Sequence, residues 1–338
     1  MTAIVHDLPI ERIERARDVI AGRVHRTPLL SSTTAGRFVG RASGVAIGDD
    51  RIHLKAEHLQ RTGSFKARGM TARVAALTPE EARRGIITMS AGNVAQAYAW
   101  AAADRGVSCV VVMPERAVRS KVEACLGYGA EVVLEGRDVG ETARAVERLR
   151  DERGLTYCHP FDDPDVIAGH GSIGLELLED LPGVDVVVVP VGGGGLICGI
   201  AAALKQRRPS VRVYGVEPGG SNALSLALEA GEVVPIRPAS VADGLGAPFA
   251  GQWTLALARR YVDDIVLLSD PEILAGLRFA IERTKQVLEP AGAAALAAVL
   301  HGRIPIRRGE RVVAVLSGGN AEVTRLGELI AAAGPLPA

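Results

Sequence analysis

One lysine of this 338-residue chain stands where its amine could take part in chemistry. Lys66 follows Ser64 and Phe65, shortly after the strand-like segment 53–57. The ordinary interpretation is a lysine on the surface, in contact with water. Partial burial would instead lower the pKa of the ammonium group and leave a free amine, which can form a Schiff base with a carbonyl compound. The residues around Lys66 leave both interpretations open.

A run of four glycines offers a place for an anion. It consists of Gly192, Gly193, Gly194 and Gly195, between an expected buried strand and a helix that begins near Leu196. Backbone N–H groups and the dipole at a helix start hold a phosphate dianion, and glycine lets the backbone approach it closely. A tight turn is the alternative, but it needs one or two glycines rather than four, so we favour an anion site. The run matches neither the P-loop nor the dinucleotide-binding pattern, so the phosphate need not belong to ATP or NAD.

Two further loops place polar groups after expected strands. The first loop opens an Ala-rich helix and consists of Ser90, Ala91, Gly92 and Asn93. Its N–H groups could hold a substrate carboxylate. An ordinary helix cap is the alternative, and it is the favoured interpretation of this loop taken by itself. Ser317 begins a similar loop, where it is either a turn residue or a hydroxyl group aimed at a ligand.

These loops must be positioned by a sheet. Short β-branched segments alternate with Ala-, Leu- and Arg-rich helical ones, and strands are expected at residues 85–89, 109–113, 131–134, 184–191, 211–216, 264–268 and 311–316. The alternation predicts an α/β fold with parallel strands and crossover helices. Ligands bind at the carboxyl ends of such strands, where the three loops lie. The Pro/Gly-rich segment 231–251 is expected to be a surface excursion.

Composition limits the classes of partner. The 39 basic residues balance the 39 acidic ones, so no overall field attracts nucleic acid or an anionic membrane, and a small molecule is the expected partner. No apolar segment is long enough to cross a membrane. The scattered cysteines, without a C-x-x-C pair, predict reduced thiols and a cytoplasmic location. The length predicts about two compact units.

Taken together, the motifs resemble those of the fold-type II pyridoxal-phosphate enzymes, in the threonine dehydratase and serine racemase branch. Four motifs match in order: T-G-S-F-K-A-R-G at 62–69, S-A-G-N at 90–93, G-G-G-G at 192–195 and S-G-G-N at 317–320. Three more support them: R-T-P-L at 26–29, D-G-L at 243–245 and E-P-A-G at 289–292. The resemblance spans nearly the whole chain.

The resemblance implies a fold and an assembly. The fold has two parallel-type sheets, each flanked by helices, as in the tryptophan synthase β-subunit. Residues 1–83 and 160–338 would form a large domain that binds the cofactor. Residues 84–159 would form a smaller, mobile domain that closes on the substrate. The expected assembly is a homodimer.

The resemblance also implies a role for each motif. Pyridoxal 5'-phosphate would form a Schiff base with Lys66, the general base, and would rest against Phe65. Its phosphate would be held by Gly192, Gly193, Gly194, Gly195 and Leu196, its ring hydroxyl by Asn93 and its pyridine nitrogen by Ser317. The substrate carboxylate would be held by Ser90, Ala91, Gly92 and Asn93. Because a neutral hydroxyl keeps the pyridine nitrogen unprotonated, the ring is a mild electron sink, which favours β-elimination over transamination.

The implied activity is loss of the β-hydroxyl group of threonine, serine or a related amino acid, which gives a 2-oxo acid and ammonia. Ala91 stands where relatives that racemise serine have a second serine, so elimination is favoured over racemisation. Val94 replaces the histidine of most relatives, which leaves the substrate open. Some relatives bind a divalent cation through a glutamate and an aspartate six residues later. Here Glu217 is present, but the position six residues later is Ala223, so no required metal is expected. A β-replacement synthase, a racemase and a non-catalytic binder of phosphorylated metabolites remain as alternatives.

Overall fold

The computed structural model describes residues 6–336 of the chain. The strands are β1 (Leu29–Ser32), β2 (Ile52–Lys55), β3 (Ile86–Met89), β4 (Cys109–Met113), β5 (Glu131–Leu134), β6 (Thr156–Tyr157), β7 (Val186–Pro190), β8 (Arg212–Pro218), β9 (Asp264–Leu268) and β10 (Val312–Val315). The helices are α1 (Ile10–Ile20), α2 (Thr33–Ser43), α3 (Lys66–Ala75), α4 (Pro79–Arg84), α5 (Asn93–Asp104), α6 (Arg119–Gly127), α7 (Val139–Arg153), α8 (Pro164–Asp180), α9 (Gly195–Arg207), α10 (Ala223–Ala230), α11 (Gln252–Tyr261), α12 (Asp270–Phe279), α13 (Pro290–Leu300) and α14 (Val323–Ala331).

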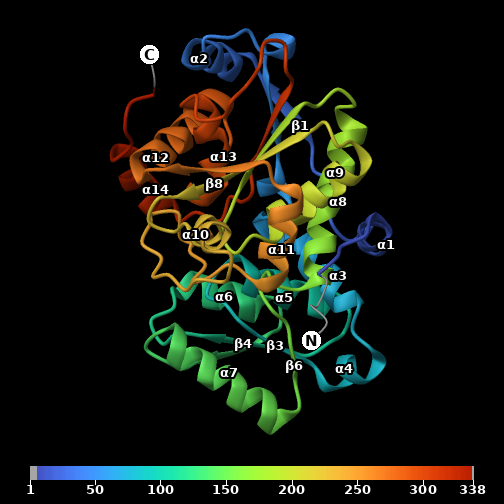
Figure 1. The fold of residues 1–338 in the computed structure, drawn as a ribbon. Coiled ribbons are helices and arrows are strands. Elements are labelled where there is room, and N and C mark those ends of the chain that lie inside the picture. The colour runs from blue at the N-terminus through green and yellow to red at the C-terminus, as the bar shows by residue number, and fades with distance from the viewer. Residues whose placement is uncertain (1–5, 337–338) are drawn as a thin grey trace.

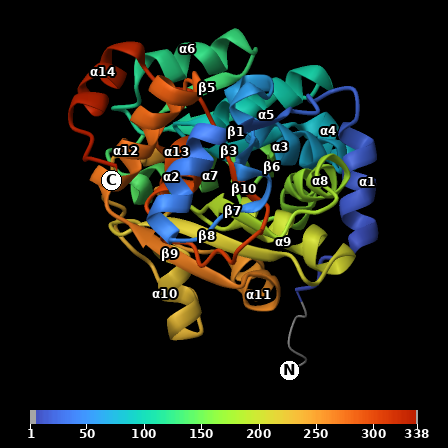
Figure 2. The same cartoon turned by 90° about the horizontal axis from the view of Figure 1, so that it is seen from above.

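The larger sheet has six strands in the order β1-β2-β10-β7-β8-β9. Its strands pair in parallel except for β1, which lies antiparallel to β2 at the edge. Helices cover both faces of this sheet, as Figures 1 and 2 show. The predicted α/β architecture is therefore confirmed for this part of the chain.

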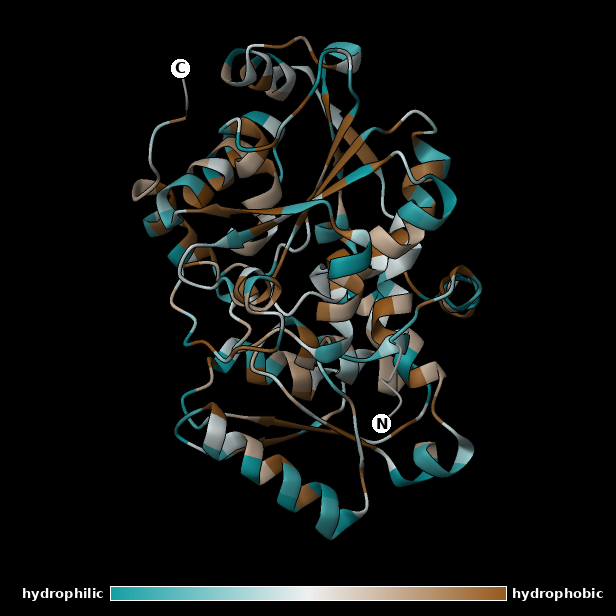
Figure 3. Cartoon of the chain, in the orientation of Figure 1, coloured by the Kyte–Doolittle hydropathy of each residue, from teal (hydrophilic) through white to brown (hydrophobic). Residues whose placement is uncertain are grey.

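The valines of β7 explain why both faces are covered. Val186 and Val188 belong to a core shared with α2, α12 and α13, whereas Val187 and Val189 belong to a core shared with α1, α8, α9 and α11. Side chains alternate between the two faces of a strand, so a strand without polar positions must be buried on both sides. The brown strands between teal-edged helices in Figure 3 show this layering.

The smaller sheet has four parallel strands in the order β5-β4-β3-β6. It forms the lower part of the molecule in Figure 1, where α5 and α6 lie between it and the rest of the chain and α7 lies on its outer face. Helix α7 is hydrophilic on its outer side in Figure 3. Both sheets of the expected two-sheet fold are thus present.

The structure corrects three details of the sequence prediction. Strands β1 and β6 were not expected, since one is an edge strand of sequence Leu-Leu-Ser-Ser and the other has two residues. The strand expected at 53–57 ends at Lys55, because Glu57 turns into a buried 3₁₀ segment. The segment 231–251 is not simply a surface excursion, since Ala242 and Leu245 within it are buried.

Candidate active site

Loops from both sheets line one cavity of about 420 Å³. They follow strands β3, β4, β6, β7 and β10, so the cavity lies at the carboxyl ends of both sheets. Every site residue predicted from the sequence lines it: Phe65, Lys66, Ser90, Ala91, Gly92, Asn93, Gly192, Gly193, Gly194, Gly195, Leu196 and Ser317. Segments far apart in the sequence thus meet at one place.

Lys66 begins α3, directly after a strained loop. Thr62 has a φ of 59°, in the left-handed region that a β-branched residue rarely adopts, and Gly63 has a φ of 71°. This turn brings the Nζ of Lys66 4.7 Å from the centre of the Phe65 ring. Burial lowers the pKa of Lys66 to about 8, against a weaker opposing effect of the Glu289 carboxylate. The surface interpretation of this lysine is therefore wrong, and about a tenth of the amine is uncharged at pH 7, far more than for a lysine in water.

The glycine loop connects β7 to α9 and leaves no room for side chains. A Cβ atom on Gly193 would lie 2.4 Å from the Phe161 ring. Gly194 has a φ of 92°, and a Cβ atom there would lie 2.8 Å from Cβ of Thr254. Glycine is required at both positions, so that the N-terminal end of α9 faces the cavity with free N–H groups.

The loop after β3 presents the N-terminal end of a second helix to the same cavity. The hydroxyl of Ser90 accepts a hydrogen bond from the Gly92 N–H group at 3.1 Å, so it shapes the loop. Gly92 precedes α5 without a side-chain cap, and the first turn of that helix contains no acidic residue. The uncapped N–H groups suit a carboxylate ligand.

Ser317 follows β10 and is buried. Its hydroxyl lies 3.5 Å from the carbonyl oxygen of Ala291, at the limit of a hydrogen bond, and its carbonyl oxygen accepts from the N–H group of Phe65 at 3.0 Å. The backbone bond joins the Ser317 loop to the lysine loop. The hydroxyl is thereby held at the cavity wall with most of its hydrogen-bonding capacity unused.

These features fit a phosphorylated aldehyde cofactor: an amine with a lowered pKa, a glycine loop at a helix start and a second helix start beside it. Residues 20–318 match the family model "Pyridoxal-phosphate dependent enzyme". The chain belongs to this family. Its cofactor is pyridoxal phosphate, and the resemblance seen in the sequence motifs is confirmed.

Individual relatives narrow the comparison. The chain is 41% identical over 325 residues to L-threonine ammonia-lyase of Thermotoga maritima, which covers 96% of this chain and 78% of the relative. It is also 41% identical to the catabolic L-threonine dehydratase of Escherichia coli K12, with 96% of this chain and 98% of the relative covered. Among solved structures, maize serine racemase superposes with a TM-score of 0.87 at 34% identity, covering 94% of this chain and 95% of that one.

Sequence reasoning did not assign a role to Glu289, although its motif supported the resemblance. Glu289 precedes α13 and lines the cavity, where burial raises the pKa of its carboxyl group to about 7. One of its oxygens accepts a hydrogen bond from Nδ2 of Asn93 at 2.7 Å. The signal in the sequence was a charged residue directly before Pro290, which by itself indicates only a helix start.

Lys121 and Asp243 also line the cavity and form an ion pair of 3.3 Å across its mouth. Lys121 lies on α6 beside the smaller sheet, and Asp243 lies in the segment 231–251. Three aromatic side chains line the remaining wall, Tyr157, Phe161 and Phe249. None of these residues belonged to the predicted site, because the contacts arise only when the two sheets come together.

A buried ion cluster lies behind α3. Arg68, 1% exposed, contacts the carboxylates of Glu57 and Glu176 at 2.9 Å and 2.6 Å, and Nζ of Lys55 contacts Glu176 at 2.6 Å. Thr27 donates to Glu57 from the chain before β1. Arg68 and Glu57 are therefore scaffold residues rather than catalysts, because their charges are paired with one another and with Glu176 away from the cavity.

The structure gives Glu217 a role at a helix start. Its carboxylate oxygens accept hydrogen bonds from the N–H groups of Leu224 and Ser225, at 2.9 Å and 3.0 Å, and from the Ser225 hydroxyl at 2.5 Å. Within residues 6–336, no group of three or more His, Cys, Asp or Glu residues has the arrangement of a metal site. Glu217 therefore stabilises the first turn of α10.

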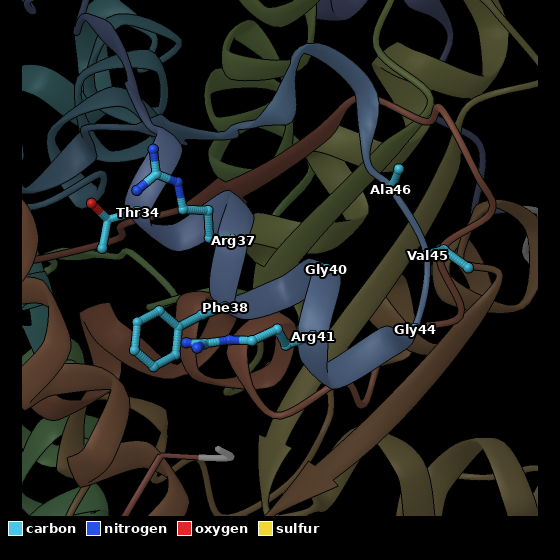
Figure 4. Close-up of a pocket in the computed structure, with 8 residues that line it drawn as sticks. All are labelled: Thr34, Arg37, Phe38, Gly40, Arg41, Gly44, Val45 and Ala46. Carbon is cyan, nitrogen blue, oxygen red and sulfur yellow. The ribbon is translucent and has the colours of Figure 1, made fainter.

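A second hollow lies far from this chemistry. Figure 4 shows the open depression beside α2, where Arg41 lies over the Phe38 ring, 4.5 Å from its centre. None of the residues assigned to the active site lines it.

Among the helices of the described residues, none has the length and apolar character needed to cross a membrane.

Proposed function

We propose that this chain is a pyridoxal-phosphate-dependent lyase that removes the β-hydroxyl group of threonine, serine or a related hydroxy-amino acid. The products are a 2-oxo acid and ammonia, so threonine would give 2-oxobutanoate and serine pyruvate. Relatives named threonine ammonia-lyase and threonine dehydratase, each 41% identical over 96% of the chain, support this reaction. The single observation that carries it is the buried amine of Lys66 in a cavity that two helix N-termini face.

Each residue group has a proposed task. The N–H groups of Gly192, Gly193, Gly194, Gly195 and Leu196 bind the cofactor phosphate. Phe65 packs against the ring, while Asn93 and Ser317 contact its polar edge. When bound, pyridoxal phosphate withdraws electrons from the substrate α-carbon, which makes the proton there easier to remove. The Lys66 amine takes this proton, because its lowered pKa of about 8 makes the free amine far more accessible than that of an ordinary lysine.

The loop of Ser90, Ala91, Gly92 and Asn93 holds the substrate carboxylate at the start of α5. Ala91 lines the cavity, and its methyl group cannot deliver a proton to the α-carbon. Racemisation by two bases on opposite faces is therefore disfavoured, and elimination is the expected outcome. Val94, 8% exposed, adds an apolar wall beside Asn93 and leaves open which hydroxy-amino acid fits best.

Three wider properties belong to the same proposal. Residues 84–159, which contain the smaller sheet, form the domain that closes on the substrate, with the large domain made of residues 1–83 and 160–338. The active protein is a homodimer. It works in the cytoplasm without a required metal, and the free, buried state of Cys109, Cys125, Cys158 and Cys198 is what a reducing compartment allows.

The decisive experiment combines chemical labelling with a substrate panel. Borohydride reduction of the holoprotein, followed by peptide mapping, should place a pyridoxyl group on Lys66, and Lys66→Ala should abolish both the label and turnover. Lys205→Ala, which changes a lysine outside the cavity, should do neither. Threonine, serine and hydroxyaspartate would then be assayed for 2-oxo acid and ammonia. A labelled protein that consumes none of them would overturn the lyase assignment, and inversion with α-deuterium exchange would indicate a racemase.

A further inference from the structure

The side chain of Asn320 connects three loops of the candidate active site. Its Nδ2 atom lies 2.7 Å from the carbonyl oxygen of Thr62, in the lysine loop, and 2.9 Å from Oδ1 of Asn93, in the substrate loop. Asn93 in turn donates from Nδ2 to Glu289 at 2.7 Å. Positions 93 and 320 lie 227 residues apart in the sequence.

The direction of this hydrogen-bond chain follows from one end. A backbone carbonyl can only accept, so the atom of Asn320 that faces Thr62 must be its NH₂ group. The second hydrogen of that group points to Asn93, which must therefore present its carbonyl oxygen. The NH₂ group of Asn93 then faces the other way, toward the carboxylate of Glu289. The opposite orientation would set the Asn93 oxygen against that carboxylate.

Backbone hydrogen bonds hold the lysine loop, which contains the Thr62 carbonyl, against the loop of Asn320. Gly319 donates from its backbone N–H group to the carbonyl of Gly63 at 2.9 Å, and Phe65 donates to the carbonyl of Ser317 at 3.0 Å. A Cβ atom on Gly63 would lie 2.1 Å from Oδ1 of Asn320, so the two loops pack without space for another side chain. The left-handed Thr62 is thus fixed relative to Asn320.

We propose that Asn320 is a positioning residue that sets the orientation of the Asn93 amide, so that Asn93 presents N–H donors to Glu289 and to the cofactor edge. This inference rests on the proposed function, in which Asn93 contacts the ring hydroxyl of pyridoxal phosphate. Asn320 itself acts through Asn93. The charged groups that influence Glu289 are Asp243, Lys121 and Lys66, whereas the side-chain hydrogen bonds of Asn93 go to Glu289 and Asn320.

Asn320→Asp tests the direction of the chain. A carboxylate at this position can only accept, so it would face two oxygens unless Asn93 rotated its NH₂ group away from Glu289. The expected result is a loss of about tenfold in the affinity of the apoprotein for pyridoxal phosphate, measured by absorbance titration, since one misplaced hydrogen bond amounts to about that factor. Asn222→Asp is the matched control, because this half-buried asparagine lies in the turn before α10 and makes no side-chain cap there.

A double-mutant cycle separates positioning from a general structural effect. Asn320→Ala should weaken cofactor binding in the wild type, but it should add little in an Asn93→Ala background, because Asn320 acts through Asn93. Thermal melting of each apoprotein verifies folding. Additive effects, or an Asn320→Asp protein that binds the cofactor within twofold of wild type, would overturn the proposal. If the wild type itself takes no borohydride label on Lys66, the proposed function fails instead.

Discussion

The amine of Lys66 is a group whose charge the folded chain tolerates poorly. Burial lowers its pKa from 10.5 to about 8, so a protonated Lys66 costs folding free energy at neutral pH. The same desolvation makes the free amine available for chemistry. Reactivity and instability of the apoprotein therefore have one physical cause.

The pH dependence of stability tests this link. Below pH 8, Lys66 is protonated in both the folded and the unfolded apoprotein, and the folded state bears the full cost of the buried charge. Between pH 8 and pH 10.5 the unfolded chain binds more protons, so this group makes stability rise with pH. Lys66→Met should thus stabilise the apoprotein at pH 7, and the gain should vanish near pH 10.5. Urea unfolding of both apoproteins at several pH values measures this gain in the free energy of unfolding. A gain independent of pH would contradict the prediction.

At the scale of elements, the ion cluster behind α3, the helix that begins with Lys66, holds that helix against its neighbours. Arg68 joins α3 to Glu176 on α8 and to Glu57 after β2, with every charge buried. Such pairs are poor sources of net stability, but removal of one partner leaves the others uncompensated.

Arg68→Met should therefore lower the free energy of unfolding by about 3–5 kcal/mol. Arg119→Met is the control, since its ion pair with Glu123 on α6 is exposed, and it should change stability by less than about 1 kcal/mol. Denaturant unfolding of both apoproteins decides the matter. Equal effects of the two substitutions would show that the buried cluster holds nothing in place.

The glycine loop gives a second prediction at this scale. A methyl group on Gly193 would meet the Phe161 ring, so Gly193→Ala should displace the loop and weaken binding of pyridoxal phosphate about tenfold or more. Gly127→Ala at the end of α6 is the matched control, because a Cβ atom there meets nothing within 4 Å. Titration of each apoprotein with the cofactor gives the comparison, and equal affinities would contradict the prediction.

Helix α10 bears on the question of a metal. Both carboxylate oxygens of Glu217 bind the first turn of this helix, which leaves the carboxylate little capacity for a cation. Mg²⁺ and Ca²⁺ need six or more oxygen ligands, and Glu217 has little capacity left to supply one. Treatment of the holoenzyme with a chelator should therefore leave turnover unchanged within about twofold. Restoration of lost activity by added magnesium would contradict this expectation.

At the scale of the whole molecule, local sequence patterns predicted most helices and strands but not the long-range contacts between them. The β-branched segments predicted β4, β5 and β9 with their observed bounds, and the four consecutive valines of β7 indicated a sheet covered on both faces. Strand β6 has only two residues, which is too short for its sequence to predict a strand. The contact of Asn320 with Asn93 joins residues 227 apart, so no local signal could reveal it. The site motifs were recognisable because each is a loop with its own backbone requirement.

The division of the cavity between two sheets has a consequence for how the protein becomes active. Lys66, the glycine loop and Ser317 all belong to segments outside residues 84–159, whereas Ser90, Ala91 and Gly92 belong to that segment. Under the proposed roles, most contacts to the cofactor therefore lie outside residues 84–159, with Asn93 as the exception, whereas Ser90, Ala91 and Gly92 serve the substrate. A lesion confined to Ser90, Ala91 or Gly92 should therefore yield a protein that keeps its yellow chromophore and yet turns over nothing.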